Sequence, residues 1–474
     1  IPAGNEADLF TYFNSFSAYK WKMYTTVEQV CFRLRCHGNC EITLWDTKVE
    51  DGADPAAHSF ASTKHEEGGA DEVVLRFSLH DVKGIVYAVI KAESDTVIFG
   101  GSFETVHEPV LPVKIAVGIC TFRREEFVKK TLETLKRETM ENPDSPLYQN
   151  VYVYVSDNGQ TLPCEELSND RIFVMPNRNT GGSGGFGRCM KEAYEDREKY
   201  GLTHILLMDD DIVLEPESLF RTYTLLNFLK EERKGAMLGG GLLRLDIPYI
   251  QHANGELWQG GRIGFTKRGY DLRRMTDVVR NEYNLPMDYN GWWYCCVPLA
   301  EQFRGFPLPI FIHGDDIEYG LRFDGNIMTL NGIGVWHDAF DNRKASSMEY
   351  YDMRNTLIAC AIHHPGYSRL HMIKRVARHL IGQMLHLRVK DQELTMKGVE
   401  DFCKGTEFLR ELDPTKLHPE IMKMGYAMQD VSDDLYKFGV DVEKTKPQPS
   451  HLYEDGGFAK KHLLSVNGWL PPAK

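Results

Sequence analysis

The alternation of apolar and polar residues changes character near residue 112. Before that point, short runs of β-branched and aromatic residues are separated by turns rich in Gly, Asp and Ser, a pattern typical of a sandwich of antiparallel strands. The predicted strands cover residues 31–36, 40–45, 72–79, 85–90 and 96–99. The first two flank the turn His37-Gly38-Asn39 and are predicted to form a hairpin. We therefore expect residues 1–110 to form an N-terminal β-sandwich.

Strands alternate with helices in the next part of the chain. Strand-length apolar runs cover residues 113–120, 151–155, 172–175 and 203–208, and a glycine-rich loop at 180–188 precedes a helix predicted from Met190 to Tyr200. This alternation favours a mostly parallel sheet, whose binding sites lie at the carboxyl ends of its strands. The turn-rich segment 239–291 suits an insertion that faces a ligand. Residues 111–350 are therefore predicted to form an α/β domain.

The pattern becomes helical from about Tyr350, so residues 351–474 are predicted to form a C-terminal helical region that ends in an irregular tail at 444–474. After a break at 364–366, residues 369–390 predict a basic amphipathic helix. Its apolar side comprises Ile373, Val376, Ala377, Leu380, Ile381 and Met384. Packing against the central domain is the more common fate of such a helix, and contact with an anionic membrane surface is the alternative.

The composition restricts the class of protein. The 55 basic and 68 acidic residues give a formal net charge of −13, which argues against a general nucleic-acid binder. No apolar run approaches the roughly 20 residues of a membrane span, and the first four residues show no signal-peptide pattern. We therefore expect a cytoplasmic protein.

The cysteines do not change this picture. Ten cysteines in 474 residues do not form a disulfide scaffold, so a reducing cytosol is the simpler interpretation. Cys31, Cys36 and Cys40 with His37 resemble a loose zinc cluster, but their spacing matches no closed zinc motif. The predicted hairpin explains them as strand residues, so zinc is not expected there.

Three adjacent carboxylates end one apolar strand. Asp209, Asp210 and Asp211 directly follow the run at 203–208. Concentrating negative charge at the edge of a core is costly unless a positive partner binds there. Mg²⁺ or Mn²⁺ is the obvious partner, since these ions prefer oxygen ligands and bridge to phosphates. A solvated acidic turn is the alternative.

Further polar groups follow in a consistent order. The glycine-rich loop suits the approach of backbone amides to an anion, although it is neither a Walker loop nor a dinucleotide fingerprint. A second acidic cluster lies at 313–318, and His337 ends another apolar run, where it can complete a metal shell of two carboxylates and one imidazole. The adjacent Trp292 and Trp293 suit stacking on sugar rings or packing in a core.

The ordered motifs resemble those of family 2 inverting glycosyltransferases, and more narrowly of the bacterial galactofuranosyltransferases that build mycobacterial cell-wall galactan. The resemblance covers about residues 112–360 and implies an N-terminal β-sandwich, a GT-A nucleotide-sugar domain and C-terminal helices. The motifs are Thr121-Phe122-Arg123, Asp157, Asn179 with the glycine-rich loop, Asp209-Asp210-Asp211, Trp292-Trp293, His313-Gly314-Asp315-Asp316-Ile317-Glu318 and Trp336-His337.

This resemblance implies a UDP-sugar donor, Mn²⁺ or Mg²⁺ as cofactor, a glycan or lipid-linked glycan acceptor, and a homo-oligomer working at the cytoplasmic face of a membrane. The nucleotide would be held by Thr121, Arg123, Asp157, Asn179, Asp209 and Asp210, with Asp157 at the uracil and Arg124 as the rival of Arg123. The metal would be held by Asp209, Asp211 and His337.

The resemblance also implies roles in the reaction. Asp316 would be the base that takes the proton of the acceptor hydroxyl, with Asp315 as its rival. The acceptor would be bound by Trp292, Trp293, His313 and Glu318. The alternatives are a rhamnosyltransferase or other pyranosyl transferase of the same family, a nucleotidyltransferase and a non-catalytic carbohydrate-binding protein.

Overall fold

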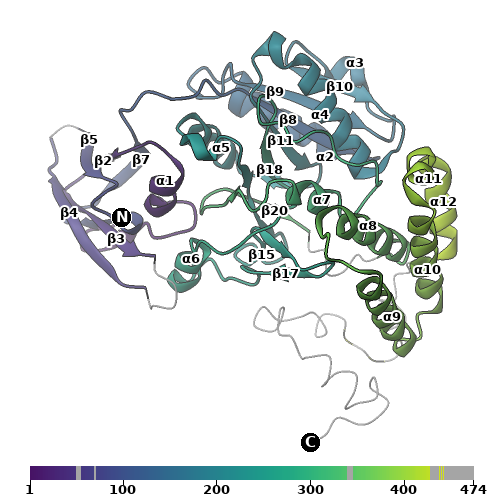
Figure 1. Ribbon diagram of the computed structural model, residues 1–474. Coiled ribbons are helices and arrows are strands. Elements are labelled where there is room, and N and C mark those ends of the chain that lie inside the picture. The colour runs from purple at the N-terminus through teal and green to yellow at the C-terminus, as the bar shows by residue number, and fades with distance from the viewer. Residues whose placement is uncertain are drawn as a thin grey trace, which may run out of the picture.

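The computed structural model describes residues 1–49, 55–68, 71–338 and 345–427, together with residues 437, 439 and 441. Two antiparallel sheets come first, a layer of mixed sheets and helices follows, and helices α8–α12 lie at the opposite side of the molecule (Figure 1). This order confirms the predicted fold class. The domain boundaries at 110 and 350 stay a prediction, and the tail at 444–474 lies outside the described residues.

The two N-terminal sheets share one core. Their orders are β1-β6-β3-β4 and β5-β2-β7. The strands β1 to β7 span Glu6–Asp8, Gln29–His37, Cys40–Lys48, Ala57–His65, Glu72–Ser78, Gly84–Ala92 and Val97–Glu104, and helix α1 spans Ala18–Tyr24. Phe32 and Phe77 from one sheet and Ile42 and Ile90 from the other are buried in the same cluster. The sheets therefore form the expected sandwich.

The predicted hairpin at 31–45 is wrong. Strand β2 pairs with β5 and β7, whereas β3 pairs with β4 and β6, so the chain crosses from one sheet to the other at Gly38. Both strands bury alternate residues, including Leu34 and Leu44, toward the shared core. The apolar runs located both strands, but such a run carries no information about the neighbouring strand.

The central sheet has seven strands in the order β10-β9-β8-β11-β18-β13-β19. In that order they span Ile172–Pro176, Val151–Asp157, Ile115–Thr121, His204–Asp209, Cys295–Pro298, Met237–Gly239 and Ile327–Met328. The pairs from β10 to β11 are parallel, and β18 is antiparallel to both of its neighbours. The carboxyl ends of β8, β9 and β11 therefore share one edge.

Short elements surround this sheet. A second sheet has the order β12-β20-β14-β15, and β16 pairs with β17. These strands, β12, β14, β15, β16, β17 and β20, span Val213–Leu214, Gly241–Arg244, Gln251–Ala253, Glu256–Trp258, Ile263–Phe265 and Gly334–His337. Helices α2 to α7 span Glu125–Leu135, Cys164–Leu167, Gly181–Tyr200, Pro216–Asn227, Met275–Asn281 and Asp315–Leu321, with single turns at Lys136–Met140 and Glu231–Arg233. The turn-rich segment 239–291 thus contains defined short strands and α6.

The glycine-rich segment is helix, not the predicted loop. Helix α4 begins at Gly181 and ends at Tyr200. Gly181 has a φ of +69°, and a Cβ there would lie 2.1 Å from the carbonyl oxygen of Phe311. A Cβ on Gly185 would lie 2.1 Å from the sulfur of Cys120 on β8. The glycines therefore permit close packing of the first turns of α4.

The C-terminal helices α8 to α12 span Met348–His363, Arg369–Leu385, Val389–Cys403, Gly405–Glu411 and Pro414–Met424. The helix predicted at 369–390 ends early, because Leu387 adopts a left-handed conformation with a φ of 58°. Among the described residues of α9 only Gln383 is buried, Val376 and Leu380 are half-buried, and Ile373, Ile381 and Met384 are exposed, so the apolar side of this helix packs only in part. No described helix is both long enough and apolar enough to cross a bilayer.

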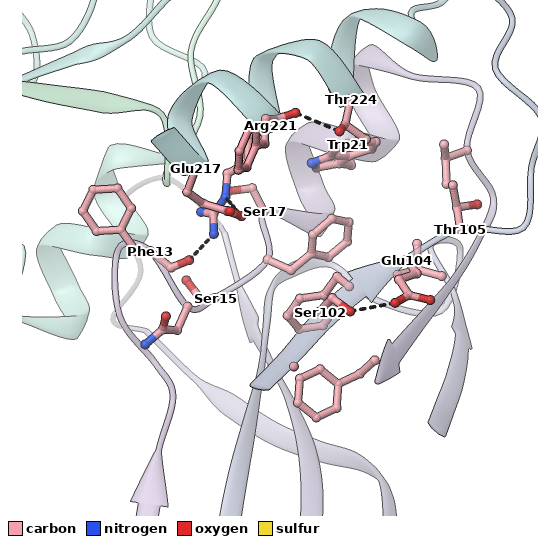
Figure 2. Close-up of a pocket in the computed structure, with 18 of the residues that line it drawn as sticks. Phe13, Ser15, Ser17, Trp21, Ser102, Glu104, Thr105, Glu217, Arg221 and Thr224 are labelled. Carbon is pink, nitrogen blue, oxygen red and sulfur yellow. Dashed lines mark hydrogen bonds and ion pairs between the residues drawn. The ribbon is translucent and has the colours of Figure 1, made fainter. Parts of the chain in front are cut away.

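A cavity of about 750 Å³ lies where the sandwich meets α5 (Figure 2). Trp21 and the Phe13 to Ser17 segment face α5 across it, and Arg221 of α5 donates to the carbonyl oxygen of Phe13 (2.6 Å). Among the described residues lining this cavity, none belongs to the two acidic clusters. The cavity is therefore a feature of the junction, separate from the strand edge.

We expect Gly181→Ala to lower the free energy of unfolding by about 1–3 kcal/mol, because alanine would be strained at this positive φ and its Cβ would clash with the carbonyl oxygen of Phe311. Thermal or urea unfolding measures the change. Gly382→Ala is the control, since its Cβ would meet no atom within 4 Å inside α9, and it should be neutral or stabilising. Equal stability of Gly181→Ala and wild type would contradict the packing described.

Candidate active site

The strand edge gathers the polar residues that follow β8, β9 and β11. In the parallel register Thr121 lies opposite Asp157, and Asp209 lies opposite Cys120. Buried apolar runs precede each of these positions, so the core fixes where the strands end. The edge therefore brings together side chains from positions almost 90 residues apart.

The three carboxylates of the triplet have different partners. Thr121 Oγ1 donates to Asp210 Oδ2 (2.6 Å), and Arg124 Nη1 lies 2.9 Å from Asp210 Oδ1 and 2.6 Å from Asp211 Oδ2. Asp211 Oδ1 also faces His337 Nε2 at 3.1 Å. Burial raises the pKa of Asp209 to about 7, against the attraction of His337. The cluster therefore contains more buried negative charge than Arg124 alone offsets.

Asp209, Asp211 and His337 form a group that can hold a metal ion. Their ligand atoms all lie within 4.8 Å of one another, and His337 is delivered by the end of β20, whose Trp336 pairs with Val213 just after the triplet. Although burial opposes it, the hydrogen bond to Asp211 raises the pKa of His337. Two carboxylates and an imidazole suit Mn²⁺ or Mg²⁺. The structure thus brings together the three predicted ligands, while metal binding itself stays a prediction.

Arg124, and not Arg123, contacts the triplet. Arg124 is the N-cap of α2, whereas Arg123 has a φ of 55° and lies over the ring of Phe122 (5.2 Å). Because the two residues are adjacent, the sequence pattern could not distinguish them. A nucleotide role for either arginine stays a prediction, and Arg124, the rival named from the sequence, is the one that contacts the carboxylates.

The predicted nucleotide residues on the neighbouring strands have local partners. The Asp157 carboxylate accepts hydrogen bonds from the backbone amides of Gly159 (3.0 Å), Thr161 (2.7 Å) and Leu162 (2.8 Å). Asn179 Oδ1 accepts from the amide of Gly181 at the start of α4 (3.1 Å). These contacts order the loops at the strand edge, and contact with a uracil stays a prediction.

The second acidic cluster occupies the first turn of α7. Burial raises the pKa of both Asp315 and Asp316, and the charge of Asp316 adds to the shift of Asp315. Asp315 is more buried, and its Oδ2 lies 3.6 Å from the position of a Cβ on Gly182, so it faces the start of α4. Asp316 is more open to solvent. Of the two predicted bases, Asp316 is the more accessible.

A strained loop positions these carboxylates. Phe311 and His313 have φ values of 77° and 65°, which non-glycine residues rarely adopt. Asn355 of α8 donates to the carbonyl oxygens of Ile312 (2.8 Å) and His313 (2.7 Å), and Arg354 donates to that of Ile310 (2.6 Å). Sequence reasoning missed both anchors, because nothing in α8 signals which loop it will hold.

Both acidic clusters lie close to Cys120. Burial raises the pKa of the Cys120 thiol, and the charges of Asp210, Asp209 and Asp315 raise it further. Asp209 lies opposite Cys120 in the register of β11 and β8, and the Cys120 sulfur lies 3.9 Å from the carbonyl oxygen of Gly181, next to the Gly182 position that Asp315 faces. The two clusters therefore lie on either side of the start of α4.

The predicted acceptor residues are held in different ways. Trp292 is 5% exposed and packs in T-shaped contacts with Phe186 and Tyr319, which fits the core alternative, while an acceptor role for Trp292 stays a prediction. Trp293 is half-buried and donates to the carbonyl oxygen of Gly240 (2.9 Å). An acceptor role for Trp293 stays a prediction.

Glu318 and His313 are paired with α8 and α7. Glu318 Oε1 lies 2.9 Å from His363 Nε2 and 3.0 Å from Arg322 Nε, and despite burial these groups lower the pKa of Glu318. His313 Nδ1 lies 2.7 Å from Asp352. The pair Glu318 with His363 and the pair His313 with Asp352 both connect α7 or the loop before it to α8. The acceptor roles of His313 and Glu318 stay predictions.

Comparison with known proteins gives the class to which this arrangement belongs. Residues 1–105 match the family described as Galactofuranosyltransferase 2 N-terminal, and residues 116–270 match Glycosyl transferase family 2. The chain therefore contains a family 2 glycosyltransferase domain at residues 116–270, preceded by a galactofuranosyltransferase 2 N-terminal domain at residues 1–105. The resemblance stated from the motifs is confirmed.

Two curated relatives are similar over most of the chain. Galactofuranosyltransferase GlfT2 of Mycobacterium tuberculosis is 29% identical over 442 residues, covering 86% of this chain and 67% of that protein. GlfT2 of Mycolicibacterium smegmatis is 27% identical over 453 residues, covering 89% of this chain and 67% of that protein. Among solved structures, the mannosyltransferase PcManGT from Pyrobaculum calidifontis in complex with GDP-Man and Mn²⁺ has a TM-score of 0.34, 11% identity, and coverage of 67% and 86%. A likeness this low supports no functional inference.

We expect His337→Ala to weaken Mn²⁺ binding at least about tenfold, because the group that can hold the metal loses its only nitrogen ligand. The rise in melting temperature with Mn²⁺, relative to chelator, measures binding. The exposed His80 supplies the control His80→Ala, which should match the wild type. An equal Mn²⁺ shift in His337→Ala would remove His337 from the metal group.

Proposed function

We propose that this chain is a metal-dependent inverting glycosyltransferase that transfers galactofuranose from a UDP-sugar to a glycan or lipid-linked glycan in bacterial cell-wall or surface polysaccharide synthesis. The observation that carries the proposal is the meeting of Asp209, Asp211 and His337 at the end of β11. The names of the two curated relatives support galactofuranose as the sugar.

The donor end of the reaction needs charge compensation. A divalent cation bound by Asp209, Asp211 and His337 would neutralise the leaving diphosphate. Arg124 adds a permanent positive charge on the same side, and Thr121 holds Asp210 so that the carboxylates do not shift apart. The residues present therefore fit a nucleotide diphosphate with its metal.

The acceptor end needs a base. In the proposed step the acceptor hydroxyl oxygen bonds to the anomeric carbon, the bond from that carbon to the diphosphate breaks, and the hydroxyl proton passes to Asp316. The raised pKa of Asp316 brings it nearer to neutral pH, which suits a general base. One displacement inverts the configuration without a covalent enzyme intermediate.

We expect Asp316→Asn to retain binding of UDP and UDP-galactofuranose but to lose transfer by about 10²–10⁴-fold, since an amide cannot accept the proton. Thermal shifts with UDP-, dTDP- and GDP-sugars in Mn²⁺ measure binding, and release of UDP with acceptor measures transfer. In the wild type, transfer should fall as the pH drops through the raised pKa of the base, above the ordinary range of Asp.

Asp315→Asn is the matched control and should lose less transfer, because Asp315 faces the start of α4. Normal turnover by Asp316→Asn would exclude it as the base. A shift with dTDP-rhamnose and none with UDP-galactofuranose would identify the rhamnosyltransferase. Released pyrophosphate would identify a nucleotidyltransferase, and sugar binding without nucleotide or metal would identify a non-catalytic carbohydrate-binding protein.

We further propose that α9 contacts the inner face of the cell membrane. Its exposed apolar residues are Leu370, Ile373, Ile381 and Met384. Lys374, Arg375 and Arg378 of the same helix line a cavity of about 820 Å³ with Arg262 and Arg388, and the same cavity is lined by Glu349 and by Asp391, which pairs with Arg388. Exposed apolar side chains beside a basic pocket suit an interfacial helix on anionic lipid.

We expect the double variant Ile373→Ser with Ile381→Ser to lose most binding to anionic phosphatidylglycerol vesicles in a flotation assay, because both side chains are more than half exposed. Phe99→Ser, which changes an exposed ring on the sandwich, is the control and should bind like the wild type. Unchanged flotation would contradict membrane contact. A variant that instead becomes a smaller species by light scattering would assign this face to a homo-oligomer.

A further inference from the structure

Two cysteines and a histidine meet at one end of the N-terminal sandwich. Cys36 is near the end of β2, Cys40 begins β3 and His65 ends β4. The two sulfur atoms are 4.0 Å apart, and the ligand atoms of all three side chains lie within 4.8 Å of one another. Their exposed fractions are 0%, 1% and 6%. The group is compact and almost completely buried.

The topology of the sandwich explains why these residues meet. Strand β2 belongs to the three-stranded sheet and β3 and β4 to the four-stranded sheet, where Cys40 lies directly opposite His65. Gly38 makes the crossing between the sheets with a φ of +106°, and a Cβ there would lie 2.4 Å from the carbonyl oxygen of Asp95. The group therefore joins the two sheets at the point where the chain passes between them.

The turn also orients the histidine. His65 Nδ1 lies 2.7 Å from the carbonyl oxygen of Gly38. A hydrogen bond from a ring nitrogen to a backbone carbonyl is the usual outer contact of a metal-binding histidine, because it fixes the tautomer and the orientation of the ring. The imidazole is thus held in place by the same turn that separates the two cysteines.

The spacing of the sulfur atoms fits a tetrahedral ion. Two thiolates bound to Zn²⁺ at about 2.3 Å lie about 3.8 Å apart at the tetrahedral angle. The observed 4.0 Å is close to that separation, whereas a disulfide requires about 2.05 Å. Thiolate and imidazole ligands favour Zn²⁺, whereas Mg²⁺ and Mn²⁺ favour oxygen ligands.

We propose that Cys36, Cys40 and His65 bind one structural Zn²⁺ ion that fastens the two sheets of the N-terminal sandwich together. A water molecule completes the four-coordinate shell. In the sequence, Cys31, Cys36, Cys40 and His37 resemble a loose zinc cluster. The group in the structure differs from that cluster, because it contains His65 and lacks Cys31 and His37. It is also separate in chemistry from the oxygen-rich group of Asp209, Asp211 and His337, so its test does not depend on the proposed transferase activity.

The test is the metal content and the cobalt spectrum of the full chain, purified under reduction without a histidine tag. We expect about one equivalent of zinc by mass spectrometry. Replacement by Co²⁺ should produce the charge-transfer absorption that thiolate ligands give. Both signals should be lost in Cys36→Ser and kept in Cys31→Ser, the control, because Cys31 is buried on the same strand outside the group. Asp211→Ala should keep both signals.

If the Cys36→Ser variant fails to fold, a second measurement on the wild type still tests the proposal. A strong chelator should lower the melting temperature of the wild type, and Zn²⁺ but not Mn²⁺ should restore it. Absence of zinc and of the cobalt band in the wild type would overturn the proposal. Retention of zinc in a folded Cys36→Ser variant, loss of zinc in Asp211→Ala, or a Cys36 to Cys40 disulfide found by peptide mapping without reductant would also overturn it.

Discussion

Burial of three adjacent carboxylates at the end of β11 is the constraint on which the surrounding structure depends. Their mutual repulsion is strengthened where water is excluded, so each needs a partner of opposite charge or a hydrogen-bond donor. Thr121 from β8, Arg124 at the start of α2 and His337 from β20 supply these partners from three elements. The pKa of Asp209 nevertheless remains raised to about 7 by burial. Charge compensation is thus incomplete in a way that suits a bound cation.

The second cluster depends on a different balance. The left-handed residues before α7 store backbone strain, and hydrogen bonds from Asn355 and Arg354 hold that conformation. Helix α8 is therefore part of the support of the site, although it lies among the C-terminal helices in Figure 1. The first turn of α7 carries Asp316, the base proposed above, so these contacts hold the backbone that leads to it.

The two candidate metal groups separate by ligand chemistry. Oxygen and imidazole ligands at the strand edge suit a hard ion such as Mn²⁺ or Mg²⁺. Sulfur and imidazole ligands in the sandwich suit the softer Zn²⁺ ion. The first group forms where parallel strands end, and the second forms where the chain changes sheets. Each therefore arises from a topological feature that places distant residues together.

The sequence by itself determined the sandwich, the parallel sheet and the residues at the strand ends, because alternation and charge at the end of an apolar run are local properties. Asp209, Asp211 and His337 could be grouped from their order, and the structure brings their ligand atoms together. Arg124 rather than Arg123 contacts the carboxylates, and Arg123 just before it has a left-handed backbone conformation. No sequence pattern reports such a conformation.

Only the tertiary structure decided which strands are neighbours and which apolar residues are covered. Strands β2 and β3 face each other across a core rather than pairing, Trp292 is buried, and α9 leaves part of its apolar side exposed. Alternation and amphipathicity identify a face, but the partner of that face is set by packing between segments far apart in the chain. The meeting of Cys36 and Cys40 with His65 follows from that packing and not from their spacing.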